Sequence, residues 1–259
     1  MTAKASSASL IVPCFNHQAT LARAVESGLR QAALHEIVIV DDHSTDDSLG
    51  VARELAASDR RILVMQTEDN IGPGGARNAG VRAACGSHVS FLDADDELLG
   101  DFLEEALDLM AAQLEMLVVK PEEEFFDPVK GYILPRFDPR HQAAVLSSVH
   151  GLVMDRAIFA RMGGFPEASV FRGLFGGEDV AFMRAVIKYL QPIGRIDHPC
   201  YRVWSSAGSH VDRFLANTRL SGDSFEFLDL HPDQLPEGLL PRAIDDYLAQ
   251  VALRVEAQA

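Results

Sequence analysis

The stretch His88-Val89-Ser90-Phe91-Leu92-Asp93-Ala94-Asp95-Asp96 does most to decide how this chain folds. Its first half is a short apolar run, as in a buried strand, and carboxylates at i and i+2 follow where that strand ends. A chain that turns there can direct Asp93 and Asp95 to one point, and hard divalent cations prefer such oxygen ligands. The alternative is a strand followed by a helix N-cap. That alternative explains Asp96 well, but it leaves two further acids that repel each other.

Short apolar runs alternate with amphipathic segments through the first half of the chain. The pattern predicts strands at 9–14, 36–41, 61–66, 88–93 and 116–120 and helices at 21–29, after Ser44 or Thr45, at 74–85 and at 102–113. Strands that alternate with helices indicate a parallel sheet covered on both faces. Such sheets bind ligands at the carboxyl ends of their strands. Four acids are predicted to lie at such ends: Asp41, Asp42, Asp93 and Asp95.

After Pro121 the pattern changes. Residues 122–141 hold three consecutive acids and three prolines, which favours an irregular insertion near the mouth of the site. Beyond it the sequence predicts a strand at 145–154, a helix at 156–162, a helix at 178–190, an extended segment at 194–203 and helices at 213–228 and 241–255.

Composition narrows the classes of protein to consider. The chain has 259 residues, of which 47% are hydrophobic, enough for one large core or two modest ones. The net charge of -15 disfavours nucleic acid as a partner, because its binders carry a basic footprint. The three scattered cysteines predict a reduced protein without disulfides. No apolar run approaches the roughly 20 residues of a membrane span, so the expected location is cytoplasmic.

Two further motifs follow predicted strands. One carboxylate of Asp41-Asp42-His43-Ser44 can accept a hydrogen bond from a base N–H or a ribose hydroxyl; a turn with a helix cap is the alternative. The glycine-rich segment 70–80 matches neither a phosphate-binding Walker loop nor a dinucleotide fingerprint, since Arg77 stands where the third glycine belongs. Arg77 is predicted either to face a phosphate or to pair with a neighbouring acid, and the two interpretations have equal weight.

The third motif, Gly176-Gly177-Glu178-Asp179, opens a predicted helix. Acids are favoured at a helix N-terminus by the helix dipole and the free N–H groups. Taken alone, the motif therefore favours a capping role, and a general base at the cleft is the alternative.

Six motifs occur in a fixed order: Val12-Pro13-Cys14-Phe15-Asn16, Val40-Asp41-Asp42-His43-Ser44-Thr45-Asp46, Asn70-x-Gly72 with Ala76-Arg77-Asn78-x-Gly80, Phe91-Leu92-Asp93-Ala94-Asp95-Asp96, Gly163-Gly164-Phe165-Pro166-Glu167 and Gly177-Glu178-Asp179. Their order and spacing resemble those of the family 2 glycosyltransferases of the GT-A fold. The resemblance is tight over 9–101, loose over 149–202 and absent beyond.

The resemblance implies a fold and a division of the chain. The expected fold is α/β, with a GT-A-like nucleotide-binding sheet that is mostly parallel and flanked by helices. The GT-A domain would occupy 1–205, with a nucleotide-sugar half at 1–120 and an acceptor half at 121–205. A C-terminal helical extension would follow at 206–259, and its helices could form a homodimer interface.

The resemblance also implies an activity, which is the transfer of one sugar from a nucleotide-diphosphate sugar to an acceptor hydroxyl with inversion. The nucleotide base would lie against Pro13, Phe15 and Asp42. Asp93 and Asp95 match the Asp-x-Asp motif, with Asp95 the direct ligand of Mn²⁺ or Mg²⁺. Asp179 matches the general base, and the adjacent Glu178 is a further candidate. The acceptor, whether a glycan, a lipid-linked molecule or a small molecule, is not specified.

The sequence departs from the family pattern after Tyr201-Arg202-Val203. Many relatives carry a histidine near the metal at the next position, where this chain has Trp204. His210 could substitute, although a solvent-facing or core histidine is favoured, and for Trp204 a core role is favoured over stacking on a sugar. The Gln-x-x-Arg-Trp signature of processive synthases is missing, which favours non-processive transfer.

Two other functions stay open at this point. A nucleotidyltransferase also uses an α/β sheet and acidic metal ligands, but it usually carries basic residues after the first strand, where this chain has Pro13-Cys14-Phe15-Asn16. A non-catalytic module that binds nucleotide sugars is the second alternative. The intact Glu178-Asp179 pair argues against that module.

Overall fold

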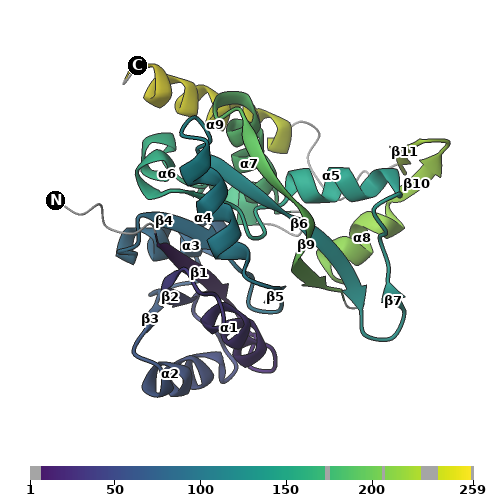
Figure 1. The fold of residues 1–259 in the computed structure, drawn as a ribbon. Helices are drawn as coiled ribbons and strands as arrows, with labels where there is room; N and C mark the ends of the chain where they lie inside the picture. The colour runs from purple at the N-terminus through teal and green to yellow at the C-terminus, as the bar shows by residue number, and fades with distance from the viewer. Residues whose placement is uncertain (1–6, 173–175, 206–207, 229–238, 258–259) are drawn as a thin grey trace.

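The structure is a computed structural model, and it describes residues 7–172, 176–205, 208–228 and 239–257. Its strands are β1 (Ala8–Cys14), β2 (Leu34–Asp41), β3 (Ile62–Gln66), β4 (His88–Phe91), β5 (Glu97–Leu98), β6 (Val118–Asp127), β7 (Gly131–Tyr132), β8 (Val153–Asp155), β9 (Ile193–Trp204), β10 (Thr218–Ser221) and β11 (Ser224–Phe227). All but the last two form one sheet in the order β3-β2-β1-β4-β8-β6-β9-β5, with β7 beside β6 (Figure 1).

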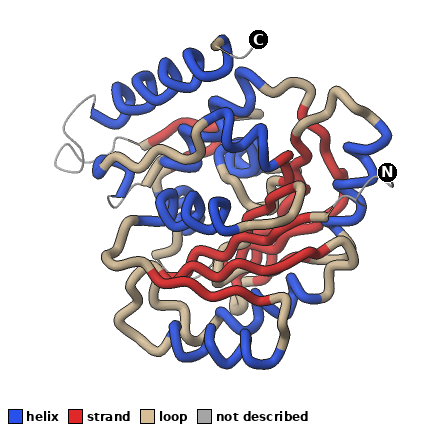
Figure 2. The backbone as a smooth tube through the Cα atoms, turned by 90° about the vertical axis from the view of Figure 1, so that its left-hand side faces the viewer, coloured by secondary structure: helices blue, strands red, loops and turns tan. Residues whose placement is uncertain are grey.

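Helices cover both faces of this sheet (Figure 2). Alternate residues of β1 point to opposite faces, so that Leu10 and Val12 belong to one core cluster and Ile11 to the other. The first cluster is covered by α1 (Leu21–Leu29), α2 (Ser48–Ser58), α4 (Phe102–Ala112), α5 (Pro139–Ser147) and α8 (His210–Ala216). The second is covered by α3 (Gly72–Ala83), α6 (Arg156–Met162), the 3-10 turn Ser169–Arg172, α7 (Glu178–Tyr189) and α9 (Leu239–Glu256).

The first half of the sheet is parallel throughout. β1 pairs in parallel with β2 and β4, and β2 pairs in parallel with β3. Their carboxyl ends therefore share one edge, which brings Asp41 and the loop after β4 to the same side of the molecule. The predicted α/β class and the predicted strands of this half are confirmed, with boundaries shifted by no more than two residues at either end.

The second half of the sheet is mixed. β8 is antiparallel to β4 and to β6, β6 is parallel to β9, and β5 is antiparallel to β9. The long β6 and β9 curve across the molecule beside one another (Figure 1). Because β5 follows the loop after β4 directly, the Asp93–Asp96 loop is held between β4 and β9.

The prediction of an irregular insertion at 122–141 is wrong. β6 continues to Asp127, and its three acids lie inside the strand because each has a basic partner. Glu122 pairs with Arg136 at 2.8 Å, Glu123 with Lys120 and Glu124 with Arg202, both at 2.5 Å. The strand is followed by β7 and by α5, whose N-cap Asp138 accepts a hydrogen bond from the Arg140 amide.

Two further element predictions are wrong. The predicted strand at 145–154 is mostly not extended, because α5 continues to Ser147 and β8 begins only at Val153. The predicted helix at 213–228 ends at Ala216 and is followed by the β10–β11 hairpin. Gly222 lies in the turn of that hairpin with φ at 61°, a conformation that suits glycine.

The predicted start of the second helix is also wrong. α2 begins at Ser48 rather than after Ser44 or Thr45. Ser44 and Thr45 instead bind the loop after β1: the Ser44 hydroxyl accepts from the Asn16 amide at 3.0 Å, and the Thr45 amide donates to the Asn16 side chain at 2.8 Å. These contacts hold the two loops against each other at the carboxyl edge of the sheet.

The last helix packs on the same core as the sheet. Ile244 and Val251 of α9 are buried in the second cluster, and the Tyr247 hydroxyl donates to the Gly164 carbonyl at 2.7 Å. The division into 1–205 and 206–259 and the dimer interface stay predictions. Within the described ranges, every helix is too short or too polar to cross a membrane.

Candidate active site

The loop after β4 places its three acids in different surroundings. Asp96 is buried, and its carboxylate accepts hydrogen bonds from the Trp204 amide at 2.9 Å and the Tyr201 hydroxyl at 3.0 Å. It therefore ties the loop to β9, and the alternative in which it caps a helix does not hold, since α4 begins only at Phe102. Burial and the neighbouring Asp95 raise the pKa of Asp96 well above its usual range.

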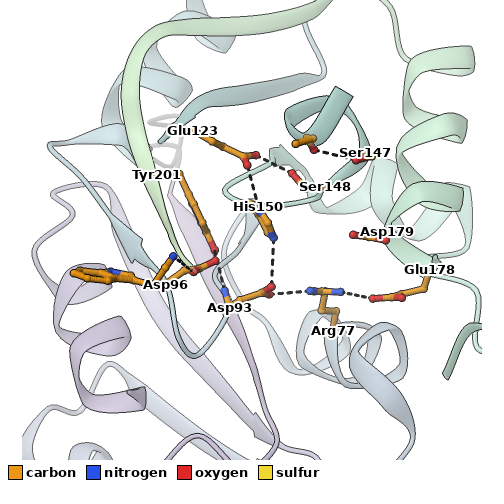
Figure 3. A network of polar contacts seen from close by, with 12 residues as sticks. Arg77, Asp93, Asp96, Glu123, Ser147, Ser148, His150, Glu178, Asp179 and Tyr201 are labelled. Atoms are coloured by element: carbon orange, nitrogen blue, oxygen red, sulfur yellow. Dashed lines mark hydrogen bonds and ion pairs between the residues drawn. The ribbon is translucent and has the colours of Figure 1, made fainter. Parts of the chain in front are cut away.

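Asp93 is held by two basic side chains (Figure 3). One oxygen accepts from Nη2 of Arg77 at 2.8 Å, and the other lies 3.5 Å from Nε2 of His150. Its backbone amide donates to the Tyr201 hydroxyl at 3.1 Å. Burial raises the pKa of the Asp93 carboxyl, but the nearby Arg77 and His150 charges outweigh it and hold that pKa far below its usual range.

Arg77 is almost fully buried in α3, at 4% exposed. Its Nη1 donates to Glu178 at 3.0 Å, while Nη2 donates to Asp93. Of the two interpretations of this residue, the structure shows the pairing with acids. The Arg77 guanidinium thus joins the loop after β4 to the start of α7.

Asp179 lies beside that pair, one residue into α7. Its side chain is half-buried and accepts a hydrogen bond from the adjacent Val180 amide at 2.7 Å. Burial, and then repulsion from Glu178, raise the pKa of Asp179 to about 6. Figure 3 shows Asp179 close to Glu178 and outside the line of paired groups. A carboxyl group with this pKa can accept a proton near neutral pH.

Asp95 is a second half-buried acid of the site whose carboxylate has no cationic partner among the described residues. Burial, and then the neighbouring Asp93 charge, raise the pKa of Asp95 above its usual range. A divalent cation suits such an oxygen ligand and would supply the missing positive charge. The chemistry of Asp95 therefore suits Mn²⁺ or Mg²⁺, while the ligand atoms that lie within 4.8 Å of one another beside it belong to Asp93, Asp96 and His150. Cation binding by Asp95 and Asp93 stays a prediction.

The residues predicted to hold the nucleotide base lie at the same edge of the sheet. Pro13 is near the end of β1, and the Phe15 ring beyond it is 43% exposed. Asp42 is buried, and its carboxylate accepts from the Ile71 amide at 2.9 Å and the Gly72 amide at 2.8 Å. Asp42 therefore anchors the glycine-rich turn before α3, a role that the sequence did not reveal; its contact with a base stays a prediction.

Trp204 is half-buried and is not among the residues of either core cluster, so its role, core or stacking on a sugar, stays a prediction. Its Nε1 donates to Glu97 at 3.1 Å, and the Arg23 guanidinium lies 4.4 Å from the ring centroid. His210 begins α8 and is exposed. A Cβ built on Gly176 would lie 3.7 Å from His210 Cε1 and 3.2 Å from the Glu178 carboxylate, so this ring is near the Glu178 end of the site. A metal-binding role for His210 stays a prediction.

The structure adds a buried network that sequence analysis missed. Lys120 and Glu123 are both fully buried and paired at 2.5 Å, and Glu123 also lies 3.1 Å from Nδ1 of His150. Because His150 also faces Asp93, the network leads from β6 to the loop after β4 (Figure 3). A lysine inside an apolar strand, three residues before an acid, was the available signal.

Known proteins are similar to part of this chain. A model of glycosyl transferase family 2 matches residues 9–162. The putative teichuronic acid biosynthesis glycosyltransferase TuaG of Bacillus subtilis is 39% identical over 103 residues, which cover 39% of this chain and 41% of TuaG. The GalNAc(5)-diNAcBac-PP-undecaprenol beta-1,3-glucosyltransferase of Campylobacter jejuni is 41% identical over 97 residues, covering 37% of this chain and 31% of that protein. The matched segment is thus less than half of either relative.

Solved structures share the fold. Residues 1–349 of S. aureus TarS in complex with UDP-GlcNAc superpose with a TM-score of 0.65 at 21% identity, covering 94% of this chain and 72% of that one. The complex of the same TarS residues with UDP gives 0.64 at 24% identity, covering 77% and 61%. At this identity the likeness concerns the fold.

Proposed function

The chain belongs to glycosyl transferase family 2, and on that premise we propose that it is a metal-dependent, inverting, non-processive glycosyltransferase. It would move one sugar from a nucleotide-diphosphate sugar to an acceptor hydroxyl. One observation carries the proposal: Asp95 and Asp179 are half-buried site carboxylates without a cationic partner among the described residues, at either end of the paired groups Asp93, Arg77 and Glu178. Asp96 also lacks a cation, but it is buried and bound by the Tyr201 hydroxyl and the Trp204 amide. Asp95 is suited to bind a cation, and Asp179 is suited to accept a proton.

Asp179 is proposed as the general base. Its carboxylate would take the proton of the acceptor hydroxyl while that oxygen bonds to the anomeric carbon and the bond to the diphosphate oxygen breaks. Attack from the face opposite the leaving group inverts the configuration. The raised pKa of about 6 supports this role, because the group is then mostly deprotonated at neutral pH and still basic enough to accept a proton.

Asp95, with Asp93, is proposed to hold Mn²⁺ or Mg²⁺. When bound, such a cation neutralises charge on the leaving diphosphate. The protein's own contribution is to keep Asp93 fixed by Arg77 and His150, and to present Asp95 without a competing partner. The complexes of TarS with UDP and UDP-GlcNAc suggest uridine diphosphate sugars as the first donors to test.

The test begins with thermal unfolding in the presence of Mn²⁺ and a panel of nucleotide sugars, since a bound ligand raises the apparent stability. The donor with the largest shift is then assayed with a panel of sugar acceptors for release of nucleoside diphosphate. Asp179→Asn should keep the thermal shift and lose about 10²–10⁴-fold of the transfer rate. Asp108→Asn, on the exposed face of α4, is the matched control and should keep full activity.

The same assay distinguishes catalysis from simple binding. A wild-type protein that binds the donor and never transfers its sugar would support a non-catalytic nucleotide-sugar module. An Asp179→Asn variant with unchanged turnover would refute the assignment of the base.

A further inference from the structure

His150 links a buried ion pair to the metal motif. Its Nδ1 lies 3.1 Å from Glu123, and its Nε2 lies 3.5 Å from Asp93. Its ring stacks on Tyr201 with centroids 5.2 Å apart and an angle of 7° between the planes. The stack fixes the plane of the ring, and the two carboxylates fix its rotation within that plane. The His150 ring is therefore held in a single orientation. The proposed function gives His150 no catalytic role that would explain this.

The Glu123 end of this contact is rigid. The Glu123 carboxylate is fully buried, and it accepts from Lys120 at 2.5 Å and from the Ser148 hydroxyl at 2.8 Å. Lys120 also donates to the backbone carbonyl of His150 at 2.7 Å, which holds both the main chain and the side chain of the histidine.

Stability alone is a weak reason for this arrangement. Taking two charged groups out of water costs several kcal/mol for each ion, and apolar side chains of similar volume often serve as well. Lys120 and Glu123 are nevertheless both inaccessible to solvent. What the ion pair provides, and an apolar pair could not, is a fixed acceptor for Nδ1 of His150.

We propose that His150 is a positioning residue that holds the Asp93 carboxylate in the orientation needed for cation binding. One oxygen of Asp93 binds Arg77 and the other faces His150, so the Asp93 carboxylate is not free to rotate. Asp95 is then the carboxylate left to take the cation directly. This inference rests on the proposed function, because it assumes a metal at Asp95 and Asp93. Outer partners of metal ligands commonly change metal affinity or activity by about 10–100-fold.

Two substitutions separate the contacts of the ring. The amide of Asn reaches roughly the place of Nδ1, so His150→Asn keeps a donor for Glu123 and loses the contact with Asp93. The amide of Gln reaches roughly the place of Nε2, so His150→Gln keeps a donor for Asp93 and loses Glu123. His198 and Glu105, 2.9 Å apart, lie with Cys200 in another group that could hold a metal ion, so the same two substitutions at His198 are the controls for cation binding away from the site.

The experiment measures binding of Mn²⁺ alone by calorimetry, together with thermal unfolding. His150→Asn should weaken Mn²⁺ binding by about 10-fold or more, His150→Gln should bind clearly more tightly than His150→Asn, and both His198 variants should bind like wild type. In the transfer assay, His150→Asn should raise the Mn²⁺ concentration for half-maximal rate more than it lowers kcat at saturating Mn²⁺. Equal Mn²⁺ affinities for the two His150 variants would overturn the inference.

A measurement on the wild-type protein covers the case in which both variants fail to fold. During titration with Mg²⁺, the ring ¹⁵N resonances of His150 should shift with the same midpoint as the backbone resonances of Asp95, while those of His198 stay in place. A His150 ring that does not respond while Asp95 does would also overturn the inference. A wild-type protein that binds neither cation would instead refute the metal site itself, and the inference with it.

Discussion

Arg77 and Glu178, 101 positions apart in the chain, form a buried ion pair with 3.0 Å between Nη1 and Oε1. The other terminal nitrogen of Arg77 binds Asp93 at 2.8 Å. One guanidinium therefore joins Asp93, in the loop after β4, to Glu178, the residue next to the proposed base Asp179. Its planar group with separate terminal nitrogens can satisfy two carboxylates at once, which a lysine ammonium does less well.

Removing this bridge should destabilise the fold. Arg77→Ala leaves two acids without their cation, and breaking a buried pair in this way costs about 3–5 kcal/mol of unfolding free energy. Arg77→Lys should lose less, because it keeps one charge. Arg82→Ala, in the same helix but with an exposed side chain 3.9 Å from Glu167, is the control and should lose no more than about 1 kcal/mol. Urea unfolding measures all three, and equal losses for the two sites would contradict the structural account.

Replacing Asp95 should separate stability from binding. Its pKa is raised in the folded protein, so its contribution to stability is present below the pKa of the unfolded chain, about 3.9, and is lost as pH rises through the folded pKa. At pH 7 without metal, Asp95→Asn should therefore unfold at a higher temperature than wild type. The variant should also lose metal-dependent binding of UDP, measured by calorimetry with and without EDTA. A less stable variant that still binds in a metal-dependent way would contradict both statements.

The pH dependence of transfer should report on Asp179. The proposed base works only when deprotonated, and its pKa is raised to about 6, so kcat/KM should rise through about pH 6 and level off above it. The value of kcat/KM rises with pH because the group is needed in its deprotonated form. Asp108→Asn should keep the wild-type profile, while the residual activity of Asp179→Asn should lack this rise. A wild-type rate that falls as pH increases from 5 to 7 would exclude Asp179 as the base.

Asn78, beside Arg77 in α3, should matter for stability and not for the cation. Its side-chain amide donates to the Phe165 carbonyl at 2.9 Å and accepts from the Phe165 amide at 2.8 Å, both in buried surroundings. Asn78→Ala leaves two buried backbone groups unsatisfied, each at a cost of about 1–3 kcal/mol. We expect urea unfolding to show this loss while the folded protein binds Mn²⁺ as wild type does. Weaker Mn²⁺ binding with unchanged stability would show that Asn78 has been misassigned.

Most of the strands and helices that the sequence predicts correctly are those in which local pattern and burial agree. The strands predicted at 9–14 and 36–41 are β1 and β2, because parallel strands buried on both faces are continuous apolar runs. The strand predicted at 61–66 is β3, an edge strand that keeps the apolar run although most of its residues are half-buried or exposed. The helix predicted at 156–162 is α6, because Asp155 caps its start and Gly163, with φ at 89°, ends it. The helix predicted at 178–190 is α7, and most of its apolar positions at helical spacing are buried.

The prediction for residues 122–141 is wrong because acids there are paired with basic partners that lie from three to 78 positions away in the chain. Glu122, Glu123 and Glu124 suggested a loop because acids are expensive to bury alone. Each is paired in the folded protein, with a residue as much as 78 positions distant in the case of Glu124 and Arg202. No local pattern announces such a partner.

The sequence by itself determined the parallel half of the sheet, the family, and the two acids, Asp95 and Asp179, on which the proposed chemistry depends. The tertiary structure decided which charges cancel: it paired Arg77 with Asp93 and Glu178, and it placed His150 on Asp93. The physical reason is that backbone pattern depends on near neighbours along the chain. The ionisation and orientation of a carboxylate depend on burial and on charges within a few ångströms in space, and these are set only when distant segments pack together.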